Sequence, residues 1–201
     1  GYCELYTRWL QMGTFLPMFR SHGTDTPREI WNFGEKGTMF YDAIEKFIKL
    51  RYHLMPYIYS LAGAVYFEDY TIMRSLLFDF PEDREARKVE NEFMFGPSLL
   101  VCAVTEPMYY GPESMPVDRE KTWRCYLPAG TDWYDYWSNE KYEGGQYVKV
   151  ETPIDRIPIF VKAGAIIPVA DGLVYAEQEP EKPVQILSLI HISEPTRRVV
   201  I

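Results

Sequence analysis

Apolar positions recur at helical spacing in the first third of the chain. Across residues 38–67 they fall at i, i+3 and i+4 intervals, with Arg51 and two lysines largely on the opposite side, which predicts a long amphipathic helix. Pro56 lies inside this pattern, so we expect a kink or a break there. A shorter helix is predicted over residues 4–15, with Gly13 close to its end.

The stretch between these two helices predicts a buried strand that leads into a polar loop. Residues 16–19 form a short apolar run, which ends where Gly23 and turn-forming residues follow. Because strand side chains alternate, Arg20 and His22 are expected on one face. The order helix, strand, polar loop, helix is typical of an α/β barrel or an open sheet, and a barrel places its chemistry at the ends of its strands.

The pattern changes to short apolar runs separated by turn residues in the second half of the chain. Residues 70–80 predict an extended run and residues 82–91 a charged turn or short helix, so we place a domain boundary between residues 88 and 89. Strands are predicted at 99–104, 122–127, 133–137, 147–150, 157–161 and 165–169. Strands of this length and spacing are typical of an antiparallel β-sandwich, which we assign to residues 89–170.

Composition and charge narrow the class of partner. The chain has 201 residues, of which 47% are hydrophobic and 25% charged, as in a globular domain with a sizeable core. Its formal net charge of -8 argues against a nucleic-acid partner. The sequence contains no run of about 20 apolar residues, which is the length that a membrane-spanning helix requires. The sequence does not indicate a compartment or an oligomeric state.

The three cysteines do not indicate a metal centre. Cys3, Cys102 and Cys125 are odd in number and far apart in the sequence, so neither a disulfide framework nor a zinc motif is expected, and we interpret them as free or buried thiols. No metal or organic cofactor is predicted.

Several motifs resemble one known family. They are Glu-Leu-Tyr-Thr-Arg-Trp-Leu-Gln-Met-Gly at 4–13, Phe-Arg-Ser-His-Gly at 19–23, Pro-Arg-Glu-Ile-Trp at 27–31 and Arg-Tyr-His-Leu-Met-Pro-Tyr-Ile-Tyr at 51–59. In this order they resemble the last part of the catalytic domain of glycoside hydrolase family 31, which contains α-glucosidases and α-xylosidases. The resemblance runs to about residue 170. It implies that the chain is a piece of a longer protein.

The resemblance also implies the fold. Residues 1–88 would be the C-terminal portion of a (β/α)8 TIM barrel, and residues 89–170 the proximal antiparallel β-sandwich that packs against it. Residues 171–186 would be a linker or the start of a distal β domain. Residues 187–197 resemble a translated sequencing adapter, so we treat 187–201 as a non-native tail.

The candidate site residues follow from the resemblance. The family is retaining and uses two catalytic Asp residues, neither of whose motifs occurs in this sequence, so no catalytic residue is expected in the chain and the chain alone should be inactive. His22 matches a histidine that hydrogen-bonds a sugar hydroxyl. Arg20, Trp31 and Tyr2 are further candidates, although a buried ion pair is favoured for Arg20 and packing for Trp31.

The chain has two carboxyl groups near His22 that could replace the two catalytic Asp residues of the family. Asp25 and Glu29 lie in the loop after His22, but a turn role for Asp25 and an ion pair of Glu29 with Arg28 are favoured over catalysis.

The expected substrate is an oligosaccharide derived from xyloglucan or starch, cleaved at its non-reducing end. Residues 21–31 are more similar to the α-xylosidase branch than to the α-glucosidase branch. Two rival readings remain: a non-catalytic carbohydrate-binding module, which would expose Trp133 or Trp137, and a purely structural sandwich, which would bury both. Alternation puts these two tryptophans on one face of their strand, and we favour structure.

Overall fold

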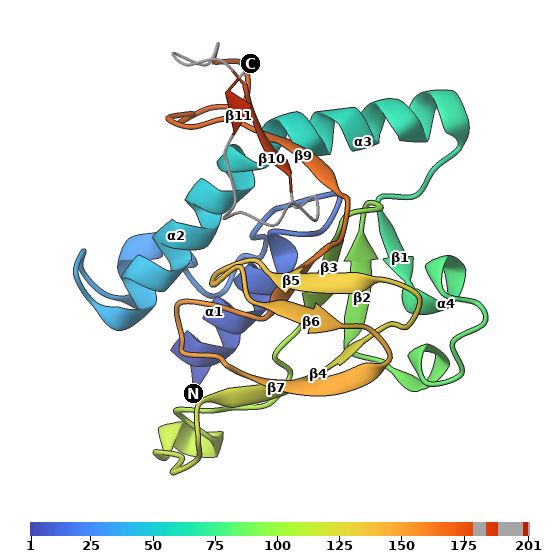
Figure 1. Ribbon diagram of the computed structural model, residues 1–201. Helices are drawn as coiled ribbons and strands as arrows, with labels where there is room; N and C mark the ends of the chain where they lie inside the picture. The colour runs from blue at the N-terminus through green and yellow to red at the C-terminus, as the bar shows by residue number, and fades with distance from the viewer. Residues whose placement is uncertain (179–183, 189–198, 201) are drawn as a thin grey trace.

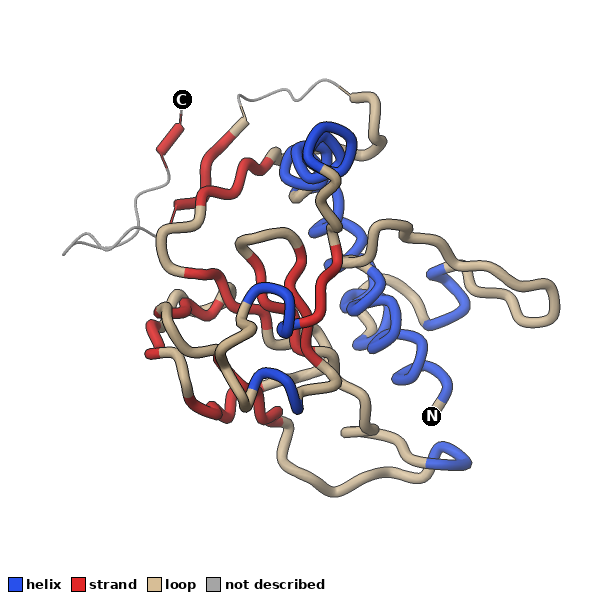
Figure 2. The backbone as a smooth tube through the Cα atoms, turned by 90° about the vertical axis from the view of Figure 1, so that its right-hand side faces the viewer, coloured by secondary structure: helices blue, strands red, loops and turns tan. Residues whose placement is uncertain are grey.

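The computed structural model describes residues 1–178, 184–188 and 199–200 (Figure 1). The long helices lie to one side and the strands of the sheets to the other, as Figure 2 shows. The helices are α1 (Tyr2–Gly13), η1 (Ile30–Phe33), α2 (Met39–His53), α3 (Met55–Glu68), α4 (Leu76–Asp79), η2 (Ala86–Lys88) and η3 (Pro112–Ser114). Within the described residues, no helix has both the length and the hydropathy that crossing a membrane requires.

The three long helices match the sequence pattern. The predicted long helix is divided at Leu54 into α2 and α3, and Pro56 lies in the first turn of α3. Proline is tolerated there because the first backbone N–H groups of a helix have no partner within it. The expected break is therefore confirmed, at the turn that precedes the proline.

The strands form antiparallel sheets. They are β1 (Met73–Ser75), β2 (Glu92–Phe95), β3 (Leu99–Cys102), β4 (Thr122–Leu127), β5 (Asp132–Asp135), β6 (Lys141–Glu143), β7 (Gln146–Glu151), β8 (Ile159–Lys162), β9 (Ile166–Val169), β10 (Gln185–Ser188) and β11 (Val199–Val200). A six-stranded sheet has the order β1-β2-β3-β8-β5-β6; β4 pairs with β7, and β9, β10 and β11 form a third sheet. This arrangement is consistent with the predicted β-sandwich.

The core lies between the six-stranded sheet, the two-stranded β4–β7 sheet and the helices. β3 is buried along its whole length, because it is flanked by β2 and β8 in the middle of the sheet. Trp133, Phe95 and Phe160 are fully buried beside it. Long apolar side chains that leave water in this way supply most of the favourable free energy of folding.

The buried strand predicted over residues 16–22 is not formed. The segment after Leu16 is turn and loop, and residues 17, 18 and 20–27 are exposed. A barrel strand needs a parallel neighbour to pair its N–H and C=O groups. Every strand pair within the described residues is antiparallel and none involves this segment, so it has no ladder to join.

The sheets extend beyond the predicted sandwich boundaries at both ends. Within the run predicted as extended, only β1 is strand, and a one-turn helix, α4, follows it. β1 pairs with β2, so the sheet begins before residue 88. Gln185 and Ile186, assigned to a linker, belong to β10, which pairs with β9 through Ser188. Of the residues predicted as a non-native tail, Leu187 and Ser188 belong to β10, and Val199 and Val200 form β11. The rest of that predicted tail lies outside the described residues.

The two sandwich tryptophans pack rather than form an exposed patch. Trp133 is 0% exposed, and its indole N–H donates to the carbonyl of Pro128 at 2.9 Å. Trp137 is half-buried against Phe47 of α2, and its indole N–H donates to the carbonyl of Ile157 at 2.8 Å. Trp133 is therefore buried as the structural alternative requires, whereas Trp137, half-buried after the end of β5, is neither fully buried nor part of an exposed patch.

Candidate functional site

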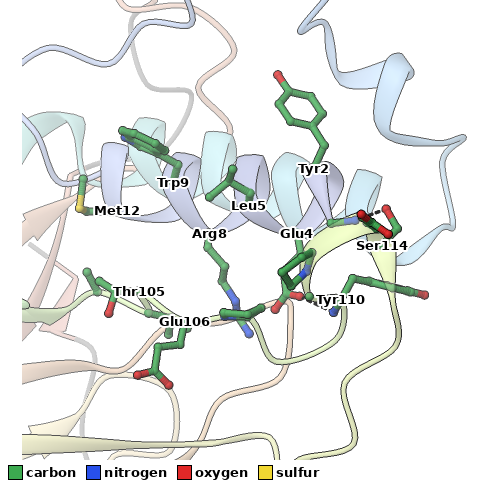
Figure 3. Close-up of a pocket in the computed structure, with 17 residues that line it drawn as sticks. Tyr2, Glu4, Leu5, Arg8, Trp9, Met12, Thr105, Glu106, Tyr110 and Ser114 are labelled. Atoms are coloured by element: carbon green, nitrogen blue, oxygen red, sulfur yellow. Dashed lines mark hydrogen bonds between the residues drawn. The ribbon is translucent and has the colours of Figure 1, made fainter.

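Helix α1 carries its polar residues inward and its apolar residues outward. Glu4 and Arg8 are buried, whereas Leu5 is exposed and Trp9 is 65% exposed. Figure 3 shows the side chains of Trp9 and Tyr2 on the side of α1 opposite to those of Arg8 and Glu4, which point toward the loop that follows β3. Tyr2, Leu5 and Trp9 therefore lie on the side of α1 that is turned away from this loop.

The carboxylate of Glu4 binds the loop after β3 by three hydrogen bonds. It accepts from the backbone N–H groups of Met108 at 2.8 Å, Tyr109 at 2.9 Å and Tyr110 at 2.8 Å. These N–H groups belong to no strand, so the carboxylate satisfies donors that would otherwise be unpaired at this interface.

Arg8 binds a second loop of the sandwich. Its guanidinium donates to the carbonyl oxygens of Thr152 at 3.1 Å, Pro153 at 3.2 Å and Arg156 at 2.8 Å, and to Oε1 of Gln11 at 3.1 Å. Burial lowers the pKa of Arg8 to about 10. Arg8 thus anchors α1 through carbonyl oxygens rather than through an ion pair.

Arg51 of α2 fixes the start of the loop between α1 and α2. Its guanidinium donates to the carbonyl oxygens of Thr14 at 2.7 Å, Leu16 at 2.6 Å and Pro17 at 3.1 Å. Burial lowers the pKa of this side chain. Arg51 was expected on the solvent side of its helix. Its guanidinium instead pairs carbonyl oxygens of this segment that a neighbouring strand would otherwise have paired.

The far part of the same loop is held by aromatic residues. The Tyr6 ring stacks on Phe33 with centroids 4.2 Å apart, and the Tyr6 hydroxyl lies 3.1 Å from Ser21 Oγ and 3.2 Å from the carbonyl oxygen of Arg28. Gly23 has φ +146°, and a Cβ there would lie 2.2 Å from Nη1 of Arg28. A glycine is therefore needed beside Arg28 for this loop shape.

The predicted site residues are not gathered in one cavity. His22 and Arg20 are exposed in the loop, and Trp31 is 70% exposed at the start of η1. The buried ion pair predicted for Arg20 and the packing predicted for Trp31 are therefore wrong, because no described element covers this side of the loop. Tyr2 lines the cavity beside α1, whereas His22 does not.

The cavity that Tyr2 lines has a volume of about 690 Å³ and lies between α1 and residues 103–114 (Figure 3). Two of its carboxylates are engaged: Glu4 accepts the three N–H groups, and Glu106 pairs with Arg119 at 3.0 Å. Its exposed walls are mostly apolar, from residues such as Leu5 and Trp9. The cavity can hold an apolar group, but it does not present the two opposed carboxyl groups that glycoside hydrolysis requires.

The two loop carboxyl groups have local roles. Asp25 accepts a hydrogen bond from the hydroxyl of Thr24 at 3.1 Å, and Glu29 accepts from the side-chain amide of Asn32 at 2.9 Å. The turn role predicted for Asp25 is supported. The ion pair predicted between Glu29 and Arg28 is not formed, since Arg28 donates to the carbonyl of Thr26 instead.

Sequence reasoning missed Glu4, Gln11 and Arg51 as anchors. Glu4, Arg8 and Gln11 recur at i, i+4 and i+7, which is the spacing of one helix face. Gln11 donates to the carbonyl of Ile154 at 2.6 Å. The sequence signal for these anchors was therefore the polar stripe of α1. The local sequence did not indicate that this polar stripe, and not the apolar face with Leu5 and Trp9, would be buried.

Two family models match the chain in order. The glycosyl hydrolases family 31 TIM-barrel domain matches residues 1–61, and the glycosyl hydrolase family 31 C-terminal domain matches residues 69–167.

Curated relatives and solved structures agree with these matches. The chain is 42% identical over 168 residues to an alpha-xylosidase of Saccharolobus solfataricus, covering 84% of this chain and 21% of the relative, and 36% identical over 171 residues to alpha-glucosidase 2 of Bacillus thermoamyloliquefaciens, covering 84% and 20%. The structure of an alpha-xylosidase from Xanthomonas citri superposes with a TM-score of 0.84 at 40% identity over 93% of this chain and 19% of that one. A Flavobacterium johnsoniae dextranase mutant complexed with isomaltotriose gives 0.81 at 35% identity over 94% and 22%. The chain thus spans about a fifth of the length of the curated relatives it matches.

Proposed function

The chain belongs to glycosyl hydrolase family 31, and from this we propose that it forms part of a retaining, exo-acting α-glycoside hydrolase that removes sugars from the non-reducing ends of oligosaccharides. The observation that carries the proposal is the ordered match of the two domain models, over residues 1–61 and 69–167. Relatives with alpha-xylosidase and alpha-glucosidase names support the reaction class.

The reaction needs two carboxyl groups across the scissile bond, about 5–5.5 Å apart in a retaining enzyme. Asp25 and Glu29 are exposed and bonded within their own turn, and Glu4 is fully engaged by backbone N–H groups. We therefore place the catalytic pair outside this chain, which alone has no activity.

Within the proposed enzyme, His22 is the substrate-binding residue. The loop around it is fixed at its start by Arg51 and further along by Tyr6, while the imidazole itself is exposed and free to meet a ligand from outside the chain. A hydrogen bond from a fixed imidazole to a sugar hydroxyl, if it shortens as the ring flattens toward the oxocarbenium-like transition state, raises kcat as well as affinity. Arg20 and Trp31 are exposed in the same loop segment and are proposed to contact the substrate less directly.

We propose an α-xylosidase in preference to an α-glucosidase. Identity is 42% to the Saccharolobus alpha-xylosidase and 40% to the Xanthomonas one, against 36% to the Bacillus alpha-glucosidase. The two sugars differ by one hydroxymethyl group, a difference worth about 1–3 kcal/mol in a binding pocket.

Hydrolysis of nitrophenyl α-xyloside and nitrophenyl α-glucoside tests the proposal. The complete protein that contains this chain should hydrolyse both, with the larger kcat/KM for the xyloside, and the 201-residue chain alone should hydrolyse neither. A complete protein without activity on either substrate would refute the function. A preference for the glucoside would refute only the α-xylosidase assignment.

Replacing His22 by Ala in the complete enzyme should lower kcat/KM about 10²-fold, equivalent to about 2–3 kcal/mol. Asp25→Asn is the matched control, because Asp25 is also exposed in this loop and bonds only its neighbour Thr24 among the described residues. Equal kcat/KM in the wild type and the His22→Ala variant would restrict His22 to a structural role.

A second role follows for the sandwich, which we propose to be a brace for the barrel portion. The buried bonds of Glu4 and Arg8 to the loops at 108–110 and 152–156 support it, as does the burial of Trp133. Binding of xyloglucan or starch fragments to the chain, lost on replacement of Trp137, would favour the carbohydrate-binding alternative.

A further inference from the structure

Three side chains with metal-ligating atoms meet in the interior of the sandwich, far from the proposed substrate loop. They are Glu92 on β2, Cys102 on β3 and Cys125 on β4, and their ligand atoms all lie within 4.8 Å of one another. Glu92 is 6% exposed and both cysteines are 0% exposed. Neither the proposed hydrolysis nor the bracing role uses this cluster.

The three residues of the cluster come from both layers of the sandwich. Glu92 and Cys102 are directly opposite each other in the antiparallel β2–β3 pair, so their side chains leave the same face of the sheet. Cys125 approaches from β4, which belongs to the other layer and pairs with β7. The cluster therefore lies between the two layers, with ligands from each.

Within the part of the chain that the structure describes, only one oxygen of the Glu92 carboxyl group accepts a hydrogen bond from a backbone N–H. The backbone N–H of Tyr126 donates to Oε1 at 2.7 Å, whereas Oε2 is buried with no N–H or O–H donor among the described residues, and the thiol of Cys102, a weak donor, is the side-chain group that interacts with this carboxyl. A buried carboxylate oxygen without a partner costs free energy, and most such atoms in native proteins are satisfied. The N–H of Tyr126 also acts as the outer partner that orients a ligating carboxylate.

We propose that Glu92, Cys102 and Cys125 bind one zinc ion that joins the two layers of the sandwich. Two thiolates and a carboxylate form a donor set that suits zinc, and hard cations such as Mg²⁺ avoid sulfur. Two sulfur atoms on one tetrahedral zinc lie about 3.8 Å apart, given Zn–S distances of about 2.3 Å. A cluster spanning at most 4.8 Å reaches this geometry by side-chain rotation. One coordination position remains for a water molecule.

Binding exchanges protons for the metal. Zinc binds the deprotonated forms of a carboxyl group and of thiols. Zinc displaces three protons to solvent and forms one Zn–O and two Zn–S bonds, with no change of oxidation state. Because the ligands come together only in the folded chain, zinc binding adds to the free energy of unfolding.

The test is zinc content after refolding. The 201-residue chain is refolded under reducing conditions with equimolar zinc, freed of unbound metal, and analysed by mass spectrometry for metal. We expect about one zinc per chain. Cys125→Ala and Glu92→Gln should lower this content at least tenfold. Cys3→Ala is the matched control, since Cys3 lies on α1 outside the cluster and should leave the content unchanged.

Cobalt gives an independent readout that does not depend on the variants folding. Co²⁺ bound to the wild-type chain by two thiolates should show a thiolate-to-cobalt charge-transfer band in the near ultraviolet. A wild-type chain that refolds with neither zinc nor this band would overturn the proposal. So would zinc that survives Cys125→Ala but is lost with Cys3→Ala, or a Cys102–Cys125 disulfide in the chain refolded with zinc.

Discussion

The sandwich and helix α1 bury opposite kinds of side chain. In the sandwich, apolar residues such as Trp133 and Phe160 are inside, and the charged Lys149 is exposed on the surface of β7. On α1, Glu4 and Arg8 are inside and Trp9 is exposed. The first region is held by apolar area removed from water, and the second by hydrogen bonds to backbone groups that have no strand partner.

The difference shows that the two regions depend on different partners. The sandwich closes its own core within the chain. The apolar face of α1, with Leu5 and Trp9, is left uncovered, as are Tyr66 and Phe67 near the end of α3. An uncovered apolar patch marks a surface for contact with other protein. Helix α1 is thus attached to the sandwich by its polar side and presents its apolar side outward, whereas α2 and α3 pack on the sandwich through buried apolar residues such as Phe47 and Leu61.

The largest effect is expected from removing apolar volume in the sandwich. Trp133→Ala should lower the free energy of unfolding by about 3–5 kcal/mol, because it leaves a cavity and an unpaired carbonyl at Pro128. Trp9→Ala, its matched control on α1, should change it by less than about 0.5 kcal/mol. Urea denaturation measures both, and similar losses for the two variants would abolish the contrast between the regions.

The next largest effect is expected where α1 is anchored. Arg8→Met should cost about 2–4 kcal/mol, because it leaves buried carbonyl oxygens of Thr152, Pro153 and Arg156 without their donor. Hydrogen exchange should increase in α1 before it increases in β3. Arg20→Met, at an exposed arginine, is the control and should be nearly neutral. An Arg8→Met variant with an unchanged free energy of unfolding would mean that α1 is held by apolar packing.

A smaller, pH-dependent effect on stability is expected at Asp83, a partly exposed residue between α4 and η2 that accepts hydrogen bonds from the sandwich. Burial alone would raise the pKa of Asp83, but hydrogen bonds from the N–H of Ala129, the Tyr126 hydroxyl and the N–H groups of Ala86 and Glu85 outweigh it and lower the pKa. The unfolded chain therefore binds this proton more readily. The stabilisation is complete above the ordinary Asp pKa of about 3.9 and is lost as the pH falls through the lower folded value.

We therefore expect Asp83→Asn to lower the Tm at neutral pH and to change it less as the pH approaches 3. Thermal unfolding followed by circular dichroism across this range measures the difference. Asp118→Asn, at an exposed position, serves as the control. A Tm difference that is constant with pH would assign the Asp83 contribution to shape rather than charge.

The smallest effect on stability is expected on the outer face of α1. The double variant Leu5→Gln and Trp9→Gln should change the free energy of unfolding by less than about 0.5 kcal/mol, because both side chains are exposed. Binding of a fluorescent apolar dye to the chain should decrease. A marked loss of stability, or undiminished dye binding, would contradict the description of this face as uncovered.

The sequence pattern was most informative where neighbours in the chain decide the structure. The break before Pro56 and strands such as β4 follow from local propensity and alternation. β2 was missed because its apolar run covers only residues 93–95 and follows the polar residues Asn91 and Glu92, of which the fold buries Glu92. The strand predicted at residues 16–22 has strand composition, but a strand also requires a neighbour.

The candidate site shows the same limit. Turn residues indicated a loop after Gly23, and the structure extends that loop back through His22. No local pattern indicated that Arg51, expected on the solvent side of its helix, would hold the start of the loop. Periodicity identified two stripes on α1 without indicating which is covered. The Glu92 cluster was invisible for a similar reason, since its members come from three strands and share no short spacing.

The bonds of α1 also constrain the order of events during synthesis. The partners of Glu4 and Arg8 lie from 104 to 148 residues further along the chain. A nascent polypeptide emerging from the ribosome can form this helix early, but it cannot dock the helix until Arg156 has left the exit tunnel. Until then the charged side chains of the helix remain hydrated, which gives chaperones a defined interval in which to hold it.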